Sequence, residues 1–145
     1  MNIRTAVVGV AALGLGAGVA TLALSPLAIA PSRVCNSPSE IMSRLELLFG
    51  MGRKDGGEVS DDNWRAFLDA EVTPRFPDGL TVLTGYGQWR NPAGTVTKET
   101  SRVLLVWLKS VPENNAKIEA IRSAWKAQFQ QESVMRVDDT SCVSF

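Results

Sequence analysis

Histidine is missing from this sequence of 145 residues. Its absence excludes Ser-His-Asp and Cys-His nucleophilic systems, histidine proton shuttles and imidazole metal ligands. Any catalysis is left to carboxylate, tyrosine, lysine and arginine side chains. We therefore assign no catalytic residue, no metal site and no cofactor from the sequence.

An excess of either charge is also missing, because 15 Lys and Arg are balanced by 15 Asp and Glu. Proteins that bind nucleic acid usually carry a basic excess or a basic stripe. The chain has neither, and it has no block of like charges of the kind that marks an interaction tail. We expect no nucleic-acid partner.

Cysteine is scarce: the two cysteines are Cys35 and Cys142, near the two ends of the chain that follows the first thirty residues. In an oxidising compartment such a pair predicts a disulfide. Closing a loop of roughly 100 residues stabilises a fold by up to ~4–5 kcal/mol in the chain-entropy model. That contribution matters for a domain of ~110 residues, because its core is modest.

The first thirty residues have the layout of a secretory signal. Arg4 is followed by an uncharged apolar and glycine-rich run over residues 6–24, and Ala28-Ile29-Ala30 offers the small residues of a cleavage site. Pro31 follows directly, and the run approaches the ~20 residues that cross a bilayer. The segment is therefore either cleaved or retained as an anchor in the inner membrane.

Both outcomes place the rest of the chain outside the cytoplasm, in the periplasm or at the envelope, with membrane contact only through an uncleaved segment. The sequence then divides into residues 1–30 as signal or anchor, residues 31–42 as a polar linker, and residues 43–145 as a single α+β domain.

Hydrophobic periodicity predicts six elements in the order β-α-β-β-α-β. The strands are expected at residues 44–49, 80–89, 103–108 and 133–137, and the helices at residues 60–73 and 112–130. This order is that of the ferredoxin-like arrangement. Right-handed crossovers place both helices on one face of a four-stranded antiparallel sheet. The other face is then exposed or covered by a partner, so we expect self-association through it, as in dimeric barrels or tautomerase-like trimers.

Helix signals support these bounds. Ser60 is a predicted N-cap, and Pro74 ends the first helix. The predicted core consists of apolar residues at helical spacing, together with Trp107 from the most apolar strand. These residues are Trp64, Phe67, Leu68, Val72, Ile118, Ile121, Trp125, Phe129 and Trp107.

The stretch RFPDGLTVLTGYGQWR, residues 75–90, contains the candidate ligand-binding residues. Pro77-Asp78-Gly79 predicts a turn that leads into a strand. That strand carries two aromatic residues towards a hairpin end with polar neighbours, where they either bind a small ligand or pack on the other arm of the hairpin. The candidates are Arg75, Asp78, Tyr86, Gln88, Trp89 and Arg90.

The combination of RLELLFG, RFPDGLTV…GQWR, SRVLLVWL and a terminal CVSF resembles a family of small exported bacterial proteins, catalogued as domain of unknown function 3574. The resemblance covers about residues 35–145, and Leu48 and Met51 depart from the family's first strand in detail. It implies export and no assigned activity. It directs attention to Arg75, Pro77, Asp78, Gly79, Gln88, Trp89 and Arg90.

Three functions remain open. The first is a non-catalytic exported module that binds a small molecule or another protein. The second is a histidine-free enzyme of the dimeric-barrel or tautomerase-like type, in which an arginine binds a carboxylate and Tyr86, Asp78 or Glu99 handles a proton. The third is a structural envelope protein tethered through residues 6–24.

Overall fold

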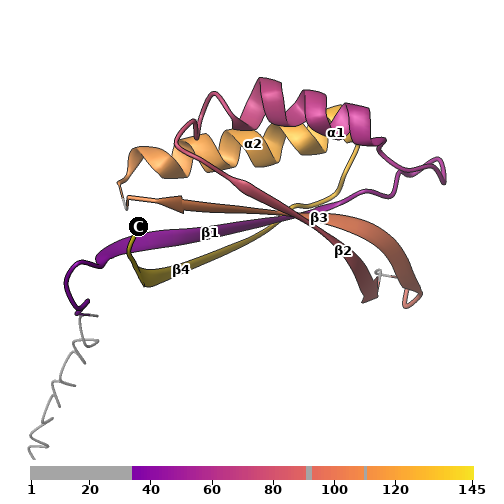
Figure 1. Cartoon of the computed structure of the whole chain (residues 1–145). Coiled ribbons are helices and arrows are strands. Elements are labelled where there is room, and N and C mark those ends of the chain that lie inside the picture. The colour runs from indigo at the N-terminus through magenta and orange to yellow at the C-terminus, as the bar shows by residue number, and fades with distance from the viewer. Residues whose placement is uncertain (1–33, 91–92, 110) are drawn as a thin grey trace, which may run out of the picture. The chain divides into compact units, whose positions relative to one another are not determined.

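The computed structural model describes residues 34–90, 93–109 and 111–145 (Figure 1). The predicted signal or anchor, residues 1–30, lies outside the described residues. So do Asn91 and Pro92 of the predicted hairpin turn.

Four strands and two helices follow one another in the predicted order β-α-β-β-α-β. They are β1 (Glu40–Gly50), α1 (Asp61–Phe67) with its π-helical continuation η1 (Leu68–Val72), β2 (Thr81–Arg90), β3 (Val96–Leu108), α2 (Glu113–Phe129) and β4 (Met135–Val143). The sheet order is β2-β3-β1-β4, and every neighbouring pair is antiparallel. Both helices cover the same face of the sheet (Figure 1). This confirms the ferredoxin-like α+β fold.

Strands β1, β3 and β4 are longer than the sequence predicts, and β3 begins at Val96 rather than at residue 103. The ladder between β1 and β4 runs from Glu40 opposite Val143 to Leu48 opposite Met135. The last three residues of the predicted linker therefore belong to β1, and β4 continues six residues beyond its predicted end at residue 137. The polar run Asp138–Ser141 hid this extension. An edge strand tolerates such residues because its side chains reach water while its backbone is paired on one side.

The first helix begins where predicted. The Ser60 hydroxyl accepts a hydrogen bond from the Asn63 N–H at 3.2 Å, which satisfies one donor of the first turn. Asp61 then pairs with Arg102 of β3, so the start of α1 is fastened to the sheet. After Phe67 the helix continues in π geometry to Val72 and stops before Pro74.

Aromatic rings form the centre of the core between the helices and the sheet. Trp125 of α2 is fully buried, and its ring centroid lies 4.3 Å from Phe129, 4.9 Å from Phe67 and 5.0 Å from Phe49. The pairs with Phe67 and Phe49 are edge-to-face, and such pairs add about 0.5–1.5 kcal/mol each to the burial of the rings. Trp64 completes the cluster from α1, with its centroid 5.4 Å from that of Trp125. The predicted helix stripes therefore meet in one place.

Trp107 is the exception, and its assignment to the core is wrong. Leu104 and Val106 of β3 face the helices and are buried. Since side chains alternate along a strand, Trp107 projects to the opposite face, where it is half-buried. The Arg44 guanidinium lies 5.9 Å from its ring centroid. A strand that is apolar on both faces hides this alternation from sequence reading.

A disulfide joins Cys35 to Cys142, residues 107 apart in sequence. It connects the segment before β1 to the end of β4, where the ladder between the two strands ends. The predicted pair is therefore in place, and it staples both ends of the domain at one edge of the sheet.

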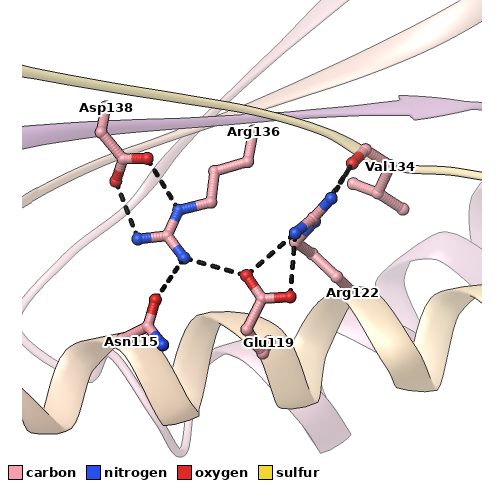
Figure 2. A network of polar contacts seen from close by, with 6 residues as sticks. All are labelled: Asn115, Glu119, Arg122, Val134, Arg136 and Asp138. Atoms are coloured by element: carbon pink, nitrogen blue, oxygen red, sulfur yellow. Dashed lines mark hydrogen bonds and ion pairs between the residues drawn. The ribbon is translucent and has the colours of Figure 1, made fainter.

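A polar network connects β4 to α2 (Figure 2). The Arg136 guanidinium donates to Asp138 at 2.8 and 3.0 Å and to Glu119 at 2.9 Å. Arg122 donates to the same Glu119 carboxylate at 2.8 and 2.9 Å and to the Val134 carbonyl. Hydrogen bonds from Arg122 and then Arg136 hold the pKa of Glu119 below its ordinary value of 4.5. The helix and the edge strand are thereby held in register.

Reduction of the disulfide is expected to lower the free energy of unfolding by about 3 kcal/mol, because it releases a long loop in the unfolded chain. Urea unfolding followed by tryptophan fluorescence, with and without dithiothreitol, measures this. The Cys35→Ser/Cys142→Ser variant is the control and should not respond to the reductant. Equal midpoints for the native chain in both conditions would contradict the prediction.

Glu119→Gln is expected to lower stability at neutral pH by up to about 1 kcal/mol, the range for partly exposed ion pairs. Because the folded-state pKa is lowered, the carboxylate contributes stability above pH 4.5 and loses it as the pH falls through the folded pKa. The gap between variant and parent should therefore close in acid. Thermal melts between neutral pH and pH 3 test this, with exposed Glu40→Gln as control. A gap that persists in acid would argue against the assignment.

Candidate binding surfaces

The six candidate residues do not converge on one site. Pairing of β2 with β3 is continuous from Thr81 to Arg90, so side chains alternate without a bulge. Tyr86, Gln88 and Arg90 project to the side of the sheet that carries the helices, whereas Trp89 projects to the other side. Arg75 and Asp78 precede β2 at the opposite end of this strand.

Arg75 and Asp78 line a cavity of about 400 Å³ at the edge of the sheet, which we call the edge pocket. It lies where the segment before β2, the end of β3 and the start of α2 meet. Its remaining lining residues are Phe76, Pro77, Trp107, Leu108, Lys109, Val111, Asn114 and Lys117. Arg75 is already engaged, since its guanidinium contacts the Glu71 carboxylate at 2.8 Å and the Glu71 carbonyl at 2.6 Å.

Tyr86 and Gln88 line a second, smaller hollow of about 310 Å³, together with Glu58, Lys98 and Thr100. This hollow lies between the β2–β3 hairpin and the glycine-rich loop after β1. The Tyr86 ring is 91% exposed, so the hollow leaves it almost entirely in solvent. Arg90 lies farther out and donates to the Gly94 carbonyl at 3.1 Å, which closes the hairpin end.

Trp89 lies on the side of the sheet away from the helices, where a carboxylate on the same side holds its indole ring. Its indole N–H donates to Glu99 Oε1 at 2.9 Å, and Glu99 Oε2 accepts from the Gly52 N–H at 3.1 Å. A Cβ at Gly50 would lie 2.7 Å from Glu99 Oε2, so only glycine leaves room for the carboxylate there. Glu99 thus ties the hairpin to the end of β1. The sequence signalled Trp89, but not the residue that holds it.

The face of the sheet away from the helices carries an apolar row across all four strands, which we call the open face row. The register places Leu83 of β2, Val103 of β3, Leu48 of β1 and Met135 of β4 side by side. Leu83 is 54% exposed and Met135 is 59% exposed. Sequence reading missed these residues, although the unbroken run VLLVWL in β3 indicated a strand with two apolar faces.

Charged residues lie on this face as well, towards the other end of β1. Arg44 pairs with Glu46 two positions along β1, and the same guanidinium lies over the Trp107 ring. Asp139 of β4 is opposite Arg44 in the register. The face beside the open face row therefore presents both charges close together.

No group of three or more His, Cys, Asp or Glu side chains in the described ranges 34–90, 93–109 and 111–145 is arranged to hold a metal ion. Within the same residues, no helix combines the length and apolarity needed to cross a membrane.

Comparison with known proteins identifies the family. The model described as "Protein of unknown function (DUF3574)" matches residues 44–145. The chain belongs to this family. No curated protein matches this DUF3574 member.

Two solved structures resemble the DUF3574 member in fold. A phage SAM lyase in complex with S-methyl-5'-thioadenosine shares 14% sequence identity, with a TM-score of 0.57 over 72% of this chain and 90% of the lyase. The apo state of a phage SAM lyase also shares 14% identity, with a TM-score of 0.51 over 79% of this chain and 97% of the other. At this identity the likeness concerns the fold alone.

Proposed function

We propose that the protein is an exported, non-catalytic binding module that packs the open face of its sheet on a second copy of itself. The observation that carries this proposal is the open face row. It presents Leu83, Val103, Leu48 and Met135 to solvent, with one residue from each strand.

An antiparallel sheet with one solvated face normally places polar residues there. Here the neighbouring position in β3, Leu105, is also apolar, and Val137 of β4 is 41% exposed. Contiguous apolar patches of this kind mark interaction sites on soluble proteins. Water contact with this face is unfavourable, and a partner that covers it removes that cost.

A second copy suits the face because the four residues of the open face row are all apolar, so one row can pack on another. Beside the row, Arg44 is paired with Glu46 within the same chain. Four strands of about nine residues span roughly 19 by 30 Å. The flat area of the sheet is therefore about 570 Å², without the additional surface of its side chains. A standard stable interface buries about 800 Å² of accessible surface per partner, so the face is of the right order.

Export is supported by two features of the chain. The sequence begins with the pattern of a secretory signal over residues 1–30. The Cys35–Cys142 disulfide belongs to a class of bond that persists in oxidising compartments.

An enzymatic function has less support. Among the groups that could handle a proton, Asp78 lines the edge pocket and Tyr86 the hollow at the hairpin, whereas the Glu99 carboxylate is bonded to Trp89 on the other side of the sheet. Each arginine candidate is bonded locally, Arg75 to Glu71 and Arg90 to Gly94. The fold likeness to phage SAM lyase is the one feature that favours an enzyme.

We therefore expect S-adenosylmethionine to remain intact during incubation with the full chain, as measured by liquid chromatography against a buffer blank. Formation of S-methyl-5'-thioadenosine that scales with protein concentration would replace the binding proposal by an enzymatic one. A heat-denatured sample controls for spontaneous breakdown.

Leu83→Asp is expected to weaken dimerisation at least tenfold, because it places an unpaired charge in an apolar interface. Light scattering coupled to size exclusion measures the mass, which should be twice that of one chain for the parent and concentration-dependent for the variant. Tyr86→Asp is the matched control, since this residue lies on the same strand but faces the helix side. A parent that stays monomeric at its highest soluble concentration, or a control that dissociates equally, would overturn the proposal.

A further inference from the structure

The edge pocket contains two lysines without an ion-pair partner among the residues that the structure describes. Lys109 and Lys117 both line it, and neither forms an ion pair with any residue in the described part of the chain. The Lys117 ammonium lies 6.0 Å from the centroid of the Phe76 ring. Because Phe76 is buried at 7% exposure, this contact keeps the ammonium near the pocket wall.

The other charges make the pocket cationic overall. Arg75, Lys109 and Lys117 contribute three positive charges and Asp78 one negative charge, and Glu71 beside Arg75 brings the balance to +1. Glu71 neutralises Arg75, so the two lysines are the cations available to a ligand. Asp78 limits the charge that the pocket accepts, because it repels a second negative group.

The pocket also offers flat apolar surface. Trp107 is half-buried and contributes to the lining, and Val111 is 46% exposed beside the start of α2. A volume of about 400 Å³ lies in the range of small-molecule sites, which is roughly 300–1,000 Å³. Cations next to apolar walls suit a ligand that has one charged group and one apolar body.

We propose that the edge pocket binds a small organic monoanion of the aromatic carboxylate class. Lys109 and Lys117 take the carboxylate, and the ring lies against Trp107 and Val111. The motif residues Arg75 and Asp78 frame the opening, with Arg75 held in place by Glu71. This site is separate from the open face row, and it gives the family motif RFPDG a role that dimerisation does not.

The test uses benzoate as the probe and the oxidised full chain in nitrogen-15 NMR titration. We expect a dissociation constant of about 1 mM, as befits a fragment of nine heavy atoms. Shifts should concentrate at residues 75–78, 107–109 and 111–117, and binding should weaken as salt is added. Benzamide, the neutral isostere, should bind at least fivefold more weakly.

Variants with opposite signs sharpen the test. Lys109→Gln/Lys117→Gln is expected to weaken benzoate binding at least fivefold, the range of solvent-exposed charge contacts. Asp78→Asn should strengthen it about threefold by removing a nearby repulsion. Lys98→Gln, at the hairpin hollow, is the matched control and should leave the affinity unchanged. Leu83→Asp should also leave it unchanged, so this site and the dimer can fail independently.

The proposal is overturned if benzoate fails to shift the pocket residues or if benzamide binds equally well. It is also overturned if the double lysine variant retains the parent affinity in a chain whose NMR spectrum shows it folded. Shifts confined to the hairpin hollow around Tyr86 and Lys98 would assign anion binding to that place instead.

Discussion

The rest of this structure depends on one aromatic core that packs on one side of the four-stranded sheet. Trp125 packs edge to face on Phe67 and on Phe49, and both helices help to bury these rings. The cluster includes the Trp125 indole N–H, which is buried and has no hydrogen-bond partner among the described residues. Because both helices lie on that side, the other side of the sheet has no described element to cover it. The candidate interface therefore follows from the packing of both helices on one side of the sheet.

Polar contacts at the periphery keep that sheet from distorting. Arg136 and Arg122 share the Glu119 carboxylate and lock β4 to α2 (Figure 2). At the other edge Arg102 bonds Asp61 of α1 and the Thr84 hydroxyl of β2. These contacts are individually modest because they are partly exposed. Together they hold both edge strands in place, so the open face row is presented as a defined surface.

A different set of hydrogen bonds holds the end of the β2–β3 hairpin. Glu99 accepts from Trp89 and from the Gly52 N–H, and Gly50 leaves the space that its carboxylate occupies. A charged group is costly to withdraw from water unless it is hydrogen-bonded, and both oxygens of Glu99 have donors. This arrangement orders the aromatic residue that the motif GYGQWR brings to the open face. It also separates Trp89 from Tyr86, which points to the other side.

Much of the fold follows from local patterns. The Ser60 cap, the stop before Pro74, the helix stripes around Trp125 and the pairing of Cys35 with Cys142 could all be read from the sequence. The cap and the helix end depend on short-range geometry, and the stripes depend on hydrophobic periodicity. Two cysteines allow a single pairing within the chain. The ferredoxin-like order follows from these elements and the handedness of their connections.

What only the tertiary structure decided is which side each strand residue faces and which distant residues meet. Trp107 was assigned to the core because VLLVWL is apolar at every position, and only the register with β1 assigns its face. The candidates Arg75 and Tyr86 lie close in sequence, but Arg75 precedes β2 and Tyr86 lies within it, and they line different hollows. Their neighbours, such as Lys117 and Glu58, come from other elements. A side-chain period of two and pairings across the whole chain make these choices non-local, so no stretch of sequence contains them.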